Sequence, residues 1–266
     1  MASSQAVLVR LRGRNIPALP LPCGRGGRGG LGGRELTQKD EVMPQHSTRE
    51  RVWAFAELLL GAAIVYAANV LKLLPINETP WLLATAWISL RRRKTGWRTL
   101  GLRSPGSWRT TFALAVAAGV LLQLLSEYVT EPLLYRLTHE RPDLSQFRSL
   151  TGNLPAAAGM LLLVWTLAAF GEEIAYRGFL LERAASTIGA SIRSYALAVF
   201  ATSLLFGIGH YYQGPAGVAG SVVSGLTFGA LFLLSGRNLW LPILAHGISD
   251  TIGLVMIYYG FYSGDL

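Results

Sequence analysis

The sequence predicts an all-α protein, a polytopic transmembrane helix bundle. Of its 266 residues, 51% are hydrophobic and only 15% are charged, and the mean hydropathy is +0.37. A typical soluble domain is about 25% charged. Several nearly uncharged stretches approach or reach the roughly 20 residues that a helix needs to cross a bilayer core of about 30 Å. Membrane lipid is therefore the expected surroundings of most of the chain.

The apolar stretches predict about seven spans, and six or eight also fit the pattern. The second stretch is short and lies between Trp81 and Trp87. The seven ranges are about 52–74, 79–90, 109–129, 155–176, 195–211, 216–235 and 239–260.

Charges between the spans predict the sidedness of the chain. Lys and Arg gather in the N-terminal tail and in the loop 91–103, whereas Glu131, Glu140 and Asp143 follow the third span, and Asp265 lies at the C-terminus. Cytoplasmic loops of membrane proteins carry an excess of Lys and Arg. We expect a multi-pass protein with a cytoplasmic N-terminus, in the inner (plasma) membrane of a bacterium.

The net charge of +9 does not indicate nucleic-acid binding, because the basic residues follow this membrane pattern. Cys23 is the only cysteine, which excludes an internal disulfide and a cysteine metal site. The Gly-rich and Arg-rich composition of residues 1–50 predicts a disordered basic tail, followed by one integral membrane domain at 51–266. A true start at Met43 and an organelle transit peptide are alternative interpretations of this segment.

Small residues follow one face of the sixth span at Gly217, Ser221, Gly225 and Gly229. In lipid this spacing lets two helix backbones approach closely. Packing against a neighbouring helix is the simplest interpretation, a dimer seam is another, and the oligomeric state stays open. The chain shows no internal repeat of the kind found in many secondary transporters.

Ionisable residues at membrane depth mark candidate functional sites, because burying a charge in lipid is costly. Glu172 and Glu173 directly follow an apolar run. Glu173 and Arg177 are four apart, which predicts a helical ion pair. Adjacent residues point in different directions, so Glu172 is expected to face a cavity and to serve as a general base. The alternative is a helix end with solvated charges.

Two further pairs share this spacing of four. Phe206 and His210 lie on one helical face, where the ring would shield the imidazole, and His246 and Asp250 lie on another. Taken singly, each histidine is also explained as a hydrogen-bonded structural residue. Two histidines and an unpaired carboxylate on three apolar helices predict one shared polar site.

These motifs resemble those of a known family. Glu-Glu-x-x-x-Arg at 172–177, Phe-x-x-x-His at 206–210 and His-x-x-x-Asp at 246–250 are similar, in this order, to the three motifs of the CAAX-protease and bacteriocin-processing family (Abi, type II CAAX prenyl endopeptidases). The resemblance covers about residues 80–260. It implies an intramembrane endopeptidase that cleaves prenylated proteins near the C-terminus or processes small peptides.

The resemblance also implies roles for the site residues. Glu172 and His210 would activate the attacking water, His246 and Asp250 would contact the developing oxyanion, and Glu173 with Arg177 would support the structure. An oxyanion site needs donors, and an ionised carboxylate only accepts. Asp250 must therefore be protonated, or it orients His246.

The cofactor is open at this stage. The family is described both as metalloproteases and as metal-free glutamate peptidases. Glu172, His210 and His246 would form a plausible zinc set with one open water position. The chain lacks the His-Glu-x-x-His spacing of zincins, which favours a mechanism without tightly bound zinc.

Two other function classes fit the same pattern. One is a non-catalytic membrane scaffold or immunity protein of this fold, and the other is a transporter that uses the acids as a proton relay. The predicted spans also leave one discrepancy, because Glu172 would lie about 25 Å and His210 about 22 Å along antiparallel spans at 1.5 Å per residue. Straight helices with these bounds would not bring the two side chains level.

Overall fold

The computed structural model describes residues 47–261. These residues form helices and connecting turns without a β-strand, and they lie within one compact unit. The predicted all-α membrane bundle is confirmed. Of the predicted tail at 1–50, only 47–50 are described. Met43, Cys23 and Asp265 lie outside the described residues.

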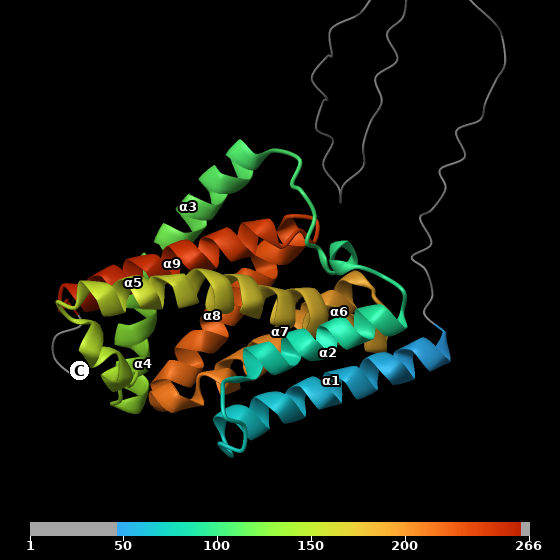
Figure 1. Cartoon of the computed structure of the whole chain (residues 1–266), viewed down its shortest axis with the longest axis horizontal. Helices are drawn as coiled ribbons and strands as arrows, with labels where there is room; N and C mark the ends of the chain where they lie inside the picture. The colour runs from blue at the N-terminus through green and yellow to red at the C-terminus, as the bar shows by residue number, and fades with distance from the viewer. Residues whose placement is uncertain (1–46, 262–266) are drawn as a thin grey trace, which may run out of the picture. The chain divides into compact units, whose positions relative to one another are not determined.

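The helices follow one another along the chain as Figure 1 shows. Those labelled η are 3-10 or π-helical segments. Their bounds are α1 Thr48–Asn69, α2 Glu78–Arg92, η1 Trp97–Leu100, α3 Trp108–Leu125, η2 Ser126–Thr130, α4 Glu131–Thr138, η3 Ser145–Leu150, α5 Leu154–Leu163, η4 Val164–Leu180, α6 Leu181–Ile188, α7 Ile192–Gly209, η5 Tyr211–Gln213, α8 Gly214–Leu234 and α9 Trp240–Tyr258.

Six helical runs among the described residues are long and apolar enough to cross a membrane. Many of their large apolar side chains, such as Leu59, Phe112 and Leu162, are more than half exposed, as expected where lipid replaces water. The remaining predicted span is α2, whose 15 residues fall short of a full crossing. The chain is an integral, multi-pass membrane protein.

Helices α1 and α2 form a hairpin whose open end is basic. Ser47 caps α1 and Glu50 completes a capping box, which fixes the start of this helix near the predicted residue 52. Glu57 of α1 binds Arg93 after α2 at 2.9 Å and Arg183 of α6 at 2.7 Å. Glu57 therefore ties α1 to the end of α2 and to α6.

The fourth predicted span, 155–176, ends too early. Helices α5, η4 and α6 form one continuous run from Leu154 to Ile188. The prediction ended the span at the charges, but these are paired inside the bundle: Arg177 with Glu173, and Arg183 with Glu57. The third predicted span, 109–129, is also too short, because the run continues through η2 and α4 to Thr138.

This longer run removes the discrepancy in depth. Beyond Glu172 the helix continues to Ile188, turns, and returns as α7 as far as His210. The outward and return segments have similar lengths, so the two side chains meet at a similar depth and line the same cavity. The span boundary that was predicted too early therefore caused the mismatch.

Helices α7 and α8 pack closely through small residues. A Cβ on Gly225 would lie 3.0 Å from the Ser203 backbone, and one on Gly229 would lie 2.7 Å from Val199. The predicted packing of the small-residue face against a neighbouring helix is present for this half. Gly217 and Ser221, the other half, line the cavity instead.

Candidate functional site

A cavity of about 430 Å³ lies inside the bundle between α3, η4, α8 and α9. Glu172, His210, His246 and Asp250 all line it, and so does Phe206. The three motifs that are far apart in the sequence therefore meet at one hollow. Its other walls are largely apolar, including Leu163, Leu167, Leu254 and Ile257.

Glu172 lies on η4, a π-helical segment with i→i+5 backbone bonding. The regular periodicity of the sequence did not predict this segment, and π-helical turns often occur at functional sites. The side chain of Glu172 is buried, and its Oε2 has no hydrogen-bond partner in the protein. The expectation of a carboxylate that faces the cavity without a cation partner on its own helix agrees with this geometry.

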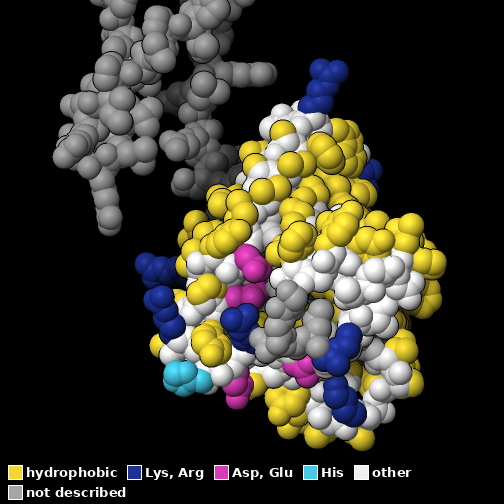
Figure 2. All heavy atoms as spheres, turned by 90° about the vertical axis from the view of Figure 1, so that its left-hand side faces the viewer, with side chains coloured by type: hydrophobic (Ala, Val, Ile, Leu, Met, Phe, Trp, Pro, Cys, Tyr) yellow, Lys and Arg dark blue, Asp and Glu magenta, His cyan; other side chains and the backbone are white. Residues whose placement is uncertain are grey.

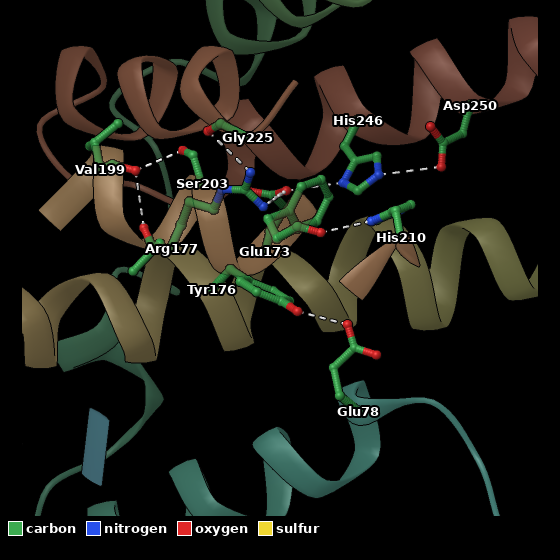
Figure 3. A network of polar contacts seen from close by, with 12 residues as sticks. Glu78, Glu173, Tyr176, Arg177, Val199, Ser203, His210, Gly225, His246 and Asp250 are labelled. Carbon is green, nitrogen blue, oxygen red and sulfur yellow. Dashed lines mark hydrogen bonds and ion pairs between the residues drawn. The ribbon is translucent and has the colours of Figure 1, made fainter. Parts of the chain in front are cut away.

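Glu173 is not part of the cavity wall and lies in a network of polar contacts (Figure 3). Its Oε1 accepts from Arg177 Nη1 at 2.9 Å, and both side chains are almost fully buried. Arg177 Nη2 donates to the Gly225 carbonyl at 3.2 Å. Its guanidinium also lies over the rings of Phe206 at 4.4 Å and Phe228 at 5.2 Å. The predicted ion pair is present, and it fixes α8 against η4.

His246 of α9 lies between two carboxylates. Its Nδ1 is 3.0 Å from Glu173 Oε1, and its Nε2 is 3.3 Å from Asp250 Oδ2. The ring stacks on Phe228 at 4.5 Å. With a proton on each ring nitrogen, His246 donates a hydrogen bond to Glu173 and forms an ion pair with Asp250. The predicted pair of His246 and Asp250 is present, and Glu173 is an additional partner that same-helix spacing could not reveal.

His210 ends α7 beside Phe206, with the two ring centroids 4.8 Å apart. Its Nδ1 lies 2.9 Å from the Phe206 carbonyl oxygen. A carbonyl only accepts, so Nδ1 is the donor, and Nε2 of a neutral ring then carries the lone pair. An imidazole in this state can accept a proton or hold a water through Nε2.

A third buried acid, Glu78 at the start of α2, was not among the predicted site residues. Its Oε1 accepts from Tyr176 at 2.7 Å and its Oε2 from Asn69 at 2.8 Å. A Cβ on Gly209 would lie 2.6 Å from Glu78 Oε1, so the carboxylate directly supports the end of α7 beside His210. Glu78 precedes a short apolar stretch, and only this position at membrane depth signalled it.

Another part of the cavity wall comes from segments that the motif analysis did not use. Polar side chains from α2, α3, α4 and the turn after α7 reach it: Asn77, Gln123, Glu131, Tyr212 and Gln213. Figure 2 views the end of the bundle that carries α4, where acidic and basic side chains gather between extended apolar surfaces.

The residues present do not fit a tightly bound zinc ion. Within 47–261, no group of three or more His, Cys, Asp or Glu side chains has the spacing of a metal site. In the candidate set of Glu172, His210 and His246, both nitrogens of His246 face carboxylates, so that ring has no lone pair directed at a metal.

Comparison with protein families gives one match. Residues 154–252 match the family described as type II CAAX prenyl endopeptidase, Rce1-like. This segment contains all three motifs and runs from α5 into α9. Comparisons with curated proteins and with solved structures gave no match.

Proposed function

We propose, on the premise of the match between residues 154–252 and the type II CAAX prenyl endopeptidase (Rce1-like) family, that this protein is an intramembrane endopeptidase. The observation that carries the proposal is the pairing of Glu172 and His210 on one cavity. Glu172 brings a buried oxygen without a partner, and His210 brings a nitrogen left free by the Phe206 contact.

In this mechanism Glu172 is the general base for water. The water oxygen bonds to the peptide carbonyl carbon, its proton passes to the Glu172 carboxylate, and the carbonyl π electrons move to oxygen as an oxyanion. Glu172 then returns that proton to the amide nitrogen. The C–N bond breaks, the carbonyl re-forms, and a carboxylic acid and an amine leave. His210 Nε2 accepts a hydrogen bond from the second O–H of the water, which stays on that oxygen, and so orients the attack.

His246 and Asp250 take part beside this centre. We propose that both contact the developing oxyanion, and the position of both in the cavity wall supports this role. A protonated His246 brings positive charge toward the developing negative charge. Its contacts with Glu173 and Asp250 hold the ring in place, and Arg177 fixes Glu173 in turn.

The substrate class follows from the walls of the cavity. Its apolar side chains, among them Val164, Leu167 and Leu254, suit a lipid-modified or membrane-associated segment. We therefore propose a prenylated, CAAX-type protein tail or a small membrane-associated peptide as substrate. A bacterial inner membrane with the basic end of the bundle in the cytoplasm fits the distribution of Arg and Lys.

The test is cleavage of a peptide library, with and without prenylated cysteines, by the purified protein in nanodiscs. Glu172→Gln and His210→Ala should each lower the cleavage rate by about 10²–10⁴-fold, the usual contribution of acid–base catalysis. Glu182→Gln is the matched control. Glu182 is a largely buried acid of α6 that contacts Tyr195 and Arg237 and is not part of the cavity wall, so this variant should cleave at the wild-type rate.

Three outcomes would contradict the proposal. Wild-type cleavage by both Glu172→Gln and His210→Ala would remove the water-activating pair. A biological phenotype that persists in both variants without cleavage would indicate a scaffold or immunity protein. Proton-coupled uptake in liposomes without cleavage would indicate a transporter.

A further inference from the structure

The oxyanion of the proposed reaction needs hydrogen-bond donors, and the donors in the three motifs already face carboxylates. Both ring nitrogens of His246 already face carboxylates, on Glu173 and Asp250. An ionised Asp250 only accepts. A second donor must therefore come from another part of the cavity wall.

Tyr212 lies where such a donor is needed. It follows His210 by two residues in η5, and the two ring centroids are 6.0 Å apart. Its side chain lines the same cavity, and it interacts electrostatically with both Glu172 and Asp250. The phenol therefore lines the same cavity as the proposed base, where a substrate would bind.

The phenol oxygen is held by two amides. Gln213 Nε2 donates to the Tyr212 hydroxyl at 3.0 Å, and the Gln146 side chain of η3 forms a second hydrogen bond with it. The backbone supports this arrangement, because Asp143 N donates to the Gln213 carbonyl at 2.9 Å. The loop before α5 and the turn after α7 therefore fix the hydroxyl from two sides.

The proton of the Tyr212 hydroxyl has no acceptor among the described residues. A tyrosine hydroxyl has one proton to donate and lone pairs that accept. Two amide donors occupy the lone pairs, and no protein acceptor for the phenol proton is found within residues 47–261. A donor that is held in position and whose proton has no protein acceptor can form a hydrogen bond to a developing oxyanion.

We propose that Tyr212 is a catalytic residue that donates its O–H to the oxyanion of the tetrahedral intermediate. The inference rests on the proposed peptidase function and adds a residue that the motifs do not contain. Gln146 and Gln213 are positioning residues for it. No proton is transferred in this role: the O–H bond stays intact while the carbonyl oxygen gains and then loses its negative charge.

The test compares Tyr212→Phe with Tyr211→Phe. Tyr211 is the adjacent phenol, 54% exposed, and is not part of the cavity wall. Loss of one oxyanion donor lowers kcat by about 10²–10³-fold in comparable sites. Tyr212→Phe should show this loss in kcat with a much smaller change in KM, and Tyr211→Phe should match the wild type. Gln146→Ala should give a smaller loss in kcat, because the phenol is kept and only one of its two hydrogen-bond partners is removed.

A binding measurement separates catalysis from folding. A peptide phosphinate, whose tetrahedral anion resembles the intermediate, should bind Tyr212→Phe more weakly by a factor similar to the loss in kcat/KM. An uncleavable substrate peptide should bind both proteins equally. Wild-type kcat in Tyr212→Phe, or equal loss of phosphinate and peptide binding, would overturn the inference. If Tyr212→Phe cleaves normally while Glu172→Gln does not, only this inference fails; normal cleavage by Glu172→Gln and His210→Ala removes the proposed function itself.

Discussion

Replacing Glu173 by Gln should destabilise the bundle, because this carboxylate joins two helices, η4 and α9, at a fully buried point. Its Oε1 is 2.9 Å from Arg177 Nη1 and 3.0 Å from His246 Nδ1, and the side chain is 0% exposed. Removing one partner of a buried ion pair costs about 3–5 kcal/mol, since the remaining charge is left uncompensated. Contacts of Arg177 with the rings of Phe206 and Phe228 survive and moderate the loss, which we place at about 3 kcal/mol.

The assay is unfolding in mixed micelles with a rising denaturing detergent fraction, for the wild type and a set of variants. Adding Arg177→Met to Glu173→Gln removes the unpaired cation, so the double variant should be more stable than Glu173→Gln alone. Arg237→Leu is the control: its ion pair with Glu182 is 47% exposed on the arginine side, and exposed pairs contribute at most about 1 kcal/mol. A Glu173→Gln protein within about 0.5 kcal/mol of the wild type, or a double variant less stable than the single one, would refute the reasoning.

Three further outcomes are expected. Gly207→Ala should lower the free energy of unfolding by about 1–3 kcal/mol in the same assay, because its Cβ would lie 2.5 Å from Val222 and 2.8 Å from the Val218 carbonyl oxygen. The control Gly159→Ala, with no atom within 4 Å of the new Cβ, should be neutral or stabilising. Equal effects of the two variants would contradict the packing argument. Asn69→Leu should destabilise by about 1–3 kcal/mol by leaving Glu78 Oε2 without its donor; a neutral result would show that the contact contributes nothing. Exhaustive chelation should leave the cleavage rate unchanged, because the described residues form no metal-ligand group; a loss restored by added zinc would contradict this.

The local half of the site was predictable from spacing. Glu173 with Arg177, Phe206 with His210, and His246 with Asp250 are each four apart on one helix, and each pair is in contact. Side chains at this spacing are neighbours whatever the rest of the fold does. Motif order then indicated that the three helices share one site.

The long-range half was not predictable in this way. Contacts such as His246 with Glu173 and Tyr176 with Glu78 depend on how separate helices pack, and no local period encodes that. The rule that charges end a span also failed after Glu173, because Arg177 and Arg183 are neutralised by buried acids. A sequence shows that a residue is charged, but the partner that makes its burial tolerable comes from elsewhere in the chain.

The cavity wall divides the chain into two kinds of segment. All four proposed motif residues lie within the matched segment 154–252, whereas a large part of the wall, including Leu122, Glu131, Leu144 and Phe147, comes from residues 122–147 ahead of it. The motif residues proposed to carry out hydrolysis and a large part of the wall that contacts the substrate thus come from separate segments of the chain. Replacing the apolar residues of 122–147 while keeping Gln146 would alter which peptides enter the cavity and leave the reacting groups in place, so the substrate range of this architecture can diverge without new chemistry.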